Sequence, residues 1–250
     1  LAEGYAGLRR RIDERLTRRD LTEQQRDSLA AMRLCLDAAG VWHARYVREL
    51  ESLLPDASAE RAELHQQRLE ALRNVPEDPP RTFHEAVQSL WMMWTFQRLC
   101  GNWSGLGRID RMLGPYLETD LAAGRITLED ARELIAHFWL KGCEWVGAQQ
   151  PGARGGSGDA QFYQNVVLAG IDADGNDITN AVTYLVLDVI EELHISDYPV
   201  AVRVGPGTPQ RLLRRIAEVQ RLGGGIVSIY NEPLVLEALH RFGYSPEETW

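Results

Sequence analysis

The chain has 250 residues, 44% of them apolar and 25% charged, which is typical of a soluble globular protein and excludes a disordered or collagen-like chain. Its net charge of −9, from 36 acidic and 27 basic residues, disfavours a nucleic-acid binder. No apolar run approaches the roughly 18 residues that span a membrane, and no signal-like leader is visible. Three widely spaced cysteines favour a reduced, cytoplasmic protein.

The first 75 residues carry helical periodicity and little else. Apolar residues recur at helical spacing over 8–16 and over 21–53, and a third helix is expected after Ser58. We therefore predict an N-terminal helical region over residues 1–75 whose side chains pack or face solvent.

A proline-rich break at 75–80 opens the second region, predicted over 76–250. Thr82 is the expected cap of a helix over 83–99, which is apolar on nearly all sides and therefore buried. The small-residue stretch 101–107 follows and can pass close to a ligand or to another backbone. Two further helices are then predicted, over 110–123 and 127–145.

After residue 146 the pattern changes to alternating strands and helices. Strands are predicted over 163–168, 199–204 and 226–230, and helices over 179–193, 208–221 and 233–242. Near-continuous apolar strands that alternate with helices predict parallel βα units whose strands are covered on both faces. The predicted fold class is α/β.

The side chains by themselves form no familiar catalytic or metal-binding motif. The acidic loop 172–177 has its glycine at the fourth position, where a calcium-binding EF-hand needs it at the sixth, so a turn is the better interpretation. The loop 155–158 lacks the lysine that completes a phosphate-binding loop. We assign no catalytic residue and no metal ligand to these 250 residues.

The last residues carry the pattern of a helix start. Ser245 suits an N-cap, Pro246 the first helical position, and Glu248 closes a capping box. Since a single helical turn is unstable alone, we expect the natural polypeptide to continue.

Four segments, in order and at matching spacing, resemble the pyruvate formate-lyase family of glycyl radical enzymes. They are the "PPRTFHEAVQ" helix start at 79–88, "GRID" with its continuation at 107–127, "YQNVVLAG" with the turn at 163–177, and the two later strands at 199–231. The resemblance implies a ten-stranded α/β barrel, of which this chain would supply early strands and a helical sheath formed by its N-terminal region.

The resemblance also implies a chemistry. In this family a glycyl radical, installed by an iron–sulfur S-adenosylmethionine activase, passes to a cysteine that abstracts hydrogen from a small-molecule substrate. A carbon–carbon or carbon–heteroatom bond is then cleaved, or water is lost, in anaerobic metabolism. The family pattern places that cysteine and glycine beyond these residues, and neither Cys35, Cys100 nor Cys143 matches. A homodimer is expected for the full-length protein.

The family pattern assigns substrate contact to six positions. Asn102 and Trp103 match a His-Ser pair of the diol dehydratase branch, and the large ring of Trp103 disfavours glycerol or propanediol as substrate. Filling of the core is the alternative role for Trp103. The six residues are Asn102, Trp103, Ser104, Tyr163, Tyr230 and Asn231.

Two other functions stay open at this point. The chain could belong to a relative that has lost catalysis and serves as a scaffold or interaction protein. It could also be an unrelated helical binding protein, which the ordered strand matches disfavour.

Overall fold

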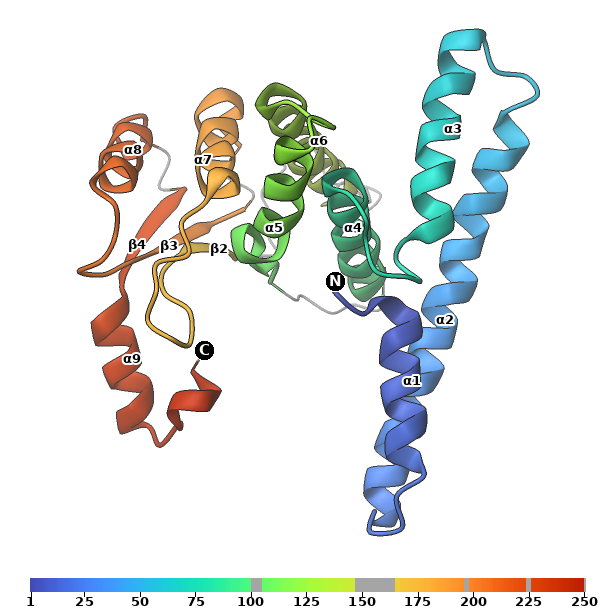
Figure 1. Cartoon of the computed structure of the whole chain (residues 1–250), viewed down its shortest axis with the longest axis horizontal. Helices are drawn as coiled ribbons and strands as arrows, with labels where there is room; N and C mark the ends of the chain where they lie inside the picture. Colours follow the sequence, from blue (N-terminus) through green and yellow to red (C-terminus); the bar gives the residue numbers. More distant parts are fainter. Residues whose placement is uncertain (100–104, 147–164, 196–197, 224–225, 250) are drawn as a thin grey trace, which may run out of the picture. The chain divides into compact units, whose positions relative to one another are not determined.

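The computed structural model describes residues 1–99, 105–146, 165–195, 198–223 and 226–249 (Figure 1). The chain divides into two compact units, Leu1–Asn102 and Trp103–Trp250. This division follows packing alone, so the family-based boundary between residues 75 and 76 stays a prediction.

The first unit is helical, as predicted. Helix α2 packs against α1, α3 and α4, and α3 also packs against α4. The cap of α2 is Thr22, whose hydroxyl accepts a hydrogen bond from the Gln25 amide at 3.2 Å. Phe83, Met92 and Trp94 of α4 are buried, which confirms the expectation of a buried apolar helix. The four helices are α1 (Gly4–Leu16), α2 (Glu23–Leu53), α3 (Ala59–Asn74) and α4 (Phe83–Leu99).

The second unit is built on a parallel sheet. Among the described residues its order is β1-β2-β3-β4, and every neighbouring pair is parallel. The three predicted strands are confirmed as parallel neighbours where they are described, while the first strand is too short to leave a periodicity in the sequence. The strands are β1 (Gly107–Arg108), β2 (Val166–Ala169), β3 (Val200–Val204) and β4 (Val227–Asn231).

Helices connect these strands, and most of them follow the predicted ranges. Helix α7 packs beside α5, α6 and α8, and this layer contacts the sheet through α5 on β2 and α8 on β4 (Figure 1). The helices are α5 (Ile109–Ala122), α6 (Leu128–Val146), α7 (Ala181–Leu193), α8 (Gln210–Gln220) and α9 (Glu232–Arg241).

The two faces of the sheet differ in burial. Leu168, Val200 and Val202, which share a face by register, are fully buried beneath the helical layer. On the opposite face Ser228 and Tyr230 are exposed in the described structure. In the described structure only the first residue of β4 is buried, so the coverage of this strand on both faces stays a prediction.

Two local predictions are confirmed. The acidic loop is a turn in which the Asp172 carboxylate accepts hydrogen bonds from the Asp174 and Asn176 amides at 3.0 and 2.9 Å. These bonds, that from Asn176 above all, lower the pKa of Asp172. The expected capping box also forms, with the Ser245 amide donating to Glu248 at 2.7 Å at the start of a 3₁₀ turn.

Candidate functional site at the carboxyl edge of the sheet

The six predicted substrate-contact residues fall into two groups. Asn102, Trp103, Ser104 and Tyr163 lie outside the described residues. Tyr230 and Asn231 are the last two residues of β4, at the carboxyl edge of the parallel sheet. Ligands of open parallel α/β sheets commonly bind outside this edge, which makes it the candidate site.

Tyr230 lies on the open face of the sheet. Its register partner on β3 is Arg203, whose own partner on β2 is Ala169, so the three side chains share one face. The helical layer covers the other face, and Tyr230 is 47% exposed. The phenol is therefore available to a molecule approaching that face of the described sheet.

Asn231 is oriented differently, because successive strand residues project to opposite faces. Its side-chain oxygen caps α9 by accepting a hydrogen bond from the Leu234 amide at 3.3 Å. Asn231 also lines a cavity of about 430 Å³ together with residues of the β3–α8 loop and the start of α9, which are Val204, Gly205, Pro206, Pro233 and Leu234. Tyr230 and Asn231 thus lie at one edge of the sheet, but their side chains project toward opposite faces.

Glu232 connects the strand ends at this edge. It is 2% exposed, and its Oε1 accepts hydrogen bonds from Arg203 Nη2 at 2.5 Å and from the Ile171 amide at 3.2 Å. The Arg203 side chain is itself 17% exposed. The sequence analysis did not single out this ion pair, because its members lie 29 residues apart and in no shared motif.

Arg108 extends the same contacts to β1. Its Nη2 donates to the carbonyl oxygens of Ala169 and Ile171 at 3.1 and 2.9 Å. Burial lowers the pKa of Arg108, and the neighbouring charge of Arg203 lowers it further. This is the arginine of the "GRID" motif, and in the structure it holds the end of β2.

Asp110, the acid of the same motif, is fully buried. Its Oδ2 accepts hydrogen bonds from the Ala169 amide at 2.6 Å and from the Thr183 hydroxyl at 2.7 Å, while Oδ1 accepts from the Arg111 amide at 2.8 Å. One carboxylate thus joins the start of α5 to β2 and to α7. Burial raises the pKa of Asp110 despite these hydrogen bonds.

The hydrogen bond that Asp110 accepts from the Ala169 amide also fixes an unusual backbone conformation. Ala169 has φ 56°, a left-handed conformation that a non-glycine residue rarely adopts, and Gly170 follows with φ 85°. A Cβ at Gly170 would lie 2.4 Å from Glu232 Oε2 and 2.9 Å from the Arg203 Cβ. Glycine is therefore required where β2 passes the ion pair.

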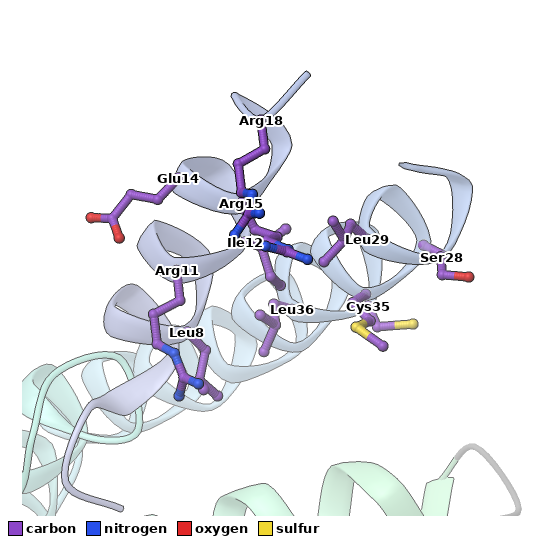
Figure 2. A pocket seen from close by; sticks show the side chains of 12 residues that line it. Leu8, Arg11, Ile12, Glu14, Arg15, Arg18, Ser28, Leu29, Cys35 and Leu36 are labelled. Atoms are coloured by element: carbon purple, nitrogen blue, oxygen red, sulfur yellow. The ribbon is translucent and has the colours of Figure 1, made fainter. Parts of the chain in front are cut away.

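A hollow of about 1110 Å³ lies in the other unit, between α1 and α2. Apolar side chains from both helices, among them Ile12, Leu29 and Leu36, line it beside Arg11 and Arg15 of α1 (Figure 2). Nothing in the described residues shows what covers this groove. Its lining offers packing surface rather than a catalytic arrangement.

No group of three or more histidine, cysteine, aspartate or glutamate residues in the described ranges could hold a metal ion. None of the helices in these ranges has the length and apolarity needed to cross a membrane.

Comparisons with known proteins agree with the arrangement of the described elements. Isethionate sulfite-lyase of Nitratidesulfovibrio vulgaris is 32% identical over 85% of this chain and 26% of its own length. A structure solved for 1,2-propanediol dehydration in Roseburia inulinivorans matches with a TM-score of 0.86 at 26% identity, over 99% of this chain and 32% of that one. A glycyl radical enzyme from Archaeoglobus fulgidus matches with a TM-score of 0.79 at 27% identity, over 98% and 32%.

These likenesses confirm the α/β fold class, while the ten-stranded barrel and the helical sheath stay predictions. The chain spans about a quarter to a third of the proteins that it matches. A family model described as pyruvate formate lyase-like covers residues 1–250. The chain belongs to the pyruvate formate lyase-like family.

Proposed function

We propose that this chain is a portion of a glycyl radical lyase or dehydratase that breaks a carbon–heteroatom bond of a small organic substrate. The carrying observation is the family match over all 250 residues. A sulfite-lyase and a structure solved for propanediol dehydration are among the relatives, and both names denote elimination from a two- or three-carbon compound.

The proposal includes the rest of the family's architecture. The four described strands are early strands of the ten-stranded barrel, the open face of the sheet is its interior, and residues 1–75 belong to its helical sheath. The exposed end of β4 supports this, because Ile229 and Tyr230 are 52% and 47% exposed on a strand with only one described neighbour. Further chain would bury them.

We also propose the cofactor and partners that the family implies. The radical resides on a glycine outside these residues and is installed by an iron–sulfur S-adenosylmethionine activase, and a cysteine outside them carries it to substrate. The full-length protein is a cytoplasmic homodimer of anaerobic metabolism. The described residues then bind and orient the substrate and hold the strand ends in place.

At this edge Tyr230 supplies an aromatic wall and a phenol that can donate or accept a hydrogen bond. The Arg203–Glu232 pair and the buried Asp110 hold no substrate themselves. Asn102, Trp103, Ser104 and Tyr163 complete the pocket in this proposal, and Asn231 contributes its side-chain amide from the cavity side. In this proposal these residues position the substrate, and residues outside them carry out the radical chemistry.

The decisive test is electron paramagnetic resonance of the full-length protein after anaerobic incubation with its activase, S-adenosylmethionine and a reductant. We expect a glycyl radical signal, followed by turnover of isethionate or trans-4-hydroxy-L-proline offered as probes, the compounds named for two relatives. A protein that forms no radical with an activase shown to be competent on another substrate would favour the scaffold alternative.

A prediction for the pocket concerns Trp103. Replacing it in the activated full-length enzyme, Trp103→Ser, should enlarge the pocket and change the ratio of kcat/KM values for bulky and small substrates more than it changes the thermal midpoint. Equal loss of activity on every substrate would contradict this if it came with about 3–5 kcal/mol of destabilisation, as expected for a truncated core aromatic. Trp103 would then be a packing residue.

A further inference from the structure

The carboxylate of Glu232 is the point at which three strand ends meet. Oε1 accepts from Arg203 Nη2 at 2.5 Å, at the end of β3, and from the Ile171 amide at 3.2 Å, just after β2. Glu232 itself directly follows β4 and begins α9. A single buried side chain therefore ties β2, β3 and β4 together at their carboxyl ends.

We propose that Glu232 and Arg203 are positioning residues of the substrate site, whose ion pair fixes the end of β4, and with it Tyr230, against β2 and β3. This inference rests on the proposed function, in which Tyr230 faces the substrate.

The contacts reach beyond neighbouring strands. The β3–β4 ladder already sets Tyr230 beside Arg203. It does not set the twist of β4 relative to β2, which lies two strands away in the sheet. The bond from the Ile171 amide to Glu232 spans that distance, so it resists a rotation of the β4 end that the ladder alone permits.

The fit around the pair leaves little freedom. Gly170 passes so close that a Cβ would lie 2.4 Å from Glu232 Oε2. Arg108 donates hydrogen bonds to the carbonyl oxygens of Ala169 and Ile171, on either side of Gly170. The backbone against which Glu232 rests is thus itself held in place.

An ion pair is suited to this position because its geometry is specific. The buried Glu232 carboxylate is paired with the Arg203 guanidinium, which satisfies it only in a narrow range of orientations. Tyr230, by contrast, is half exposed and lacks covering helices in the described structure, so its own packing cannot fix it. The position of Tyr230 therefore depends on the neighbouring Arg203–Glu232 ion pair.

The test uses Glu232→Gln, which keeps the size of the side chain and removes its charge. The matched control is Glu191→Gln, because Glu191 pairs with Arg215 between α7 and α8, in the helical layer. Arg203→Lys serves as the conservative variant, since it keeps the positive charge opposite Glu232, and Arg203→Met removes that charge.

Hydrogen exchange of the full-length protein gives a readout that needs no activity. We expect faster exchange in the peptide that covers β4 for Glu232→Gln and Arg203→Met, and wild-type exchange there for Glu191→Gln. Unchanged exchange of this peptide in Glu232→Gln would overturn the inference.

Kinetics of the activated enzyme give the second readout, on whichever of isethionate and trans-4-hydroxy-L-proline the wild type converts. For Glu232→Gln we expect kcat/KM to fall about tenfold at wild-type radical content, chiefly through a higher KM, which is less than the roughly 100-fold loss of rate that a displacement of 1 Å can cost. Arg203→Lys should keep most of the wild-type KM.

The two proposals fail in different ways. A KM that stays at the wild-type value, or an activity that falls only in proportion to radical content, would contradict the positioning role. If the wild type forms no radical at all, the proposed function fails, and the exchange comparison still decides whether the pair holds β4.

Discussion

Replacing Gly142 by alanine should lower the thermal midpoint of the full-length protein, because no space exists for the added methyl group. A Cβ at this position of α6 would lie 1.2 Å from the Tyr198 hydroxyl oxygen and 2.4 Å from Cζ. Tyr198 is 2% exposed, and its ring packs against Trp139 at a centroid distance of 4.9 Å. Overpacking of this kind costs about 3 kcal/mol or more.

Two further variants make this expectation specific. In the Tyr198→Leu background the clashing ring is gone. Adding Gly142→Ala to that variant should therefore lower the thermal midpoint much less than Gly142→Ala lowers it in wild type. Gly207→Ala, where a Cβ has no neighbour within 4 Å and φ is not positive, should stay within about 0.5 kcal/mol of wild type. A midpoint for Gly142→Ala equal to that of Gly207→Ala would show that Tyr198 is not seated against α6.

The second large effect is expected at Asp110. Asp110→Ala leaves the Ala169 amide and the Thr183 hydroxyl without their acceptor inside the protein. Each unsatisfied buried donor costs about 1–3 kcal/mol, so we expect a loss of about 3 kcal/mol, seen as a lower thermal midpoint. Asp174→Ala, in the exposed acidic turn, is the control and should be close to neutral.

The pH dependence of the stability difference between wild type and Asp110→Asn tests the same site. We expect the sign of this dependence to be opposite to that for a surface aspartate. Burial raises the pKa of Asp110 in the folded protein, so the folded state holds this proton more tightly than the unfolded state. As pH rises from about 4, the ordinary range of an aspartate, through that raised value, wild type should lose stability relative to Asp110→Asn. A midpoint difference that is constant from pH 4 to 8 would contradict this.

The elements of this fold were largely predictable from the sequence, since long helices and apolar strands carry strong periodicity. Thr82 does cap α4, since its hydroxyl accepts a hydrogen bond from the Glu85 amide at 3.2 Å. The short strand β1 was missed because two residues, Gly107 and Arg108, define no period. Its existence depends on pairing with β2, which is a tertiary interaction.

The site was less predictable for a physical reason. Its organising residues, Arg108, Arg203 and Glu232, act through contacts between strand ends that lie 29 to 63 residues apart, and single charged residues leave no periodic signal. The sequence motif containing Arg108 was visible, but its role in holding two carbonyl oxygens was not. The exposure of β4 could not be predicted, because an apolar strand carries the same sequence pattern whether one of its faces or both are covered.

Asn231 has only half of its amide free for a ligand. The oxygen accepts from the Leu234 amide and so belongs to the helix cap, and the same residue lines the cavity between the β3–α8 loop and α9. Any molecule recognised there must offer a lone pair, such as an oxygen of a carboxylate, sulfonate or hydroxyl. Asn231→Asp would keep the capping oxygen and replace the NH₂ donor by a negatively charged acceptor, which repels a carboxylate or sulfonate but accepts a hydrogen bond from a hydroxyl.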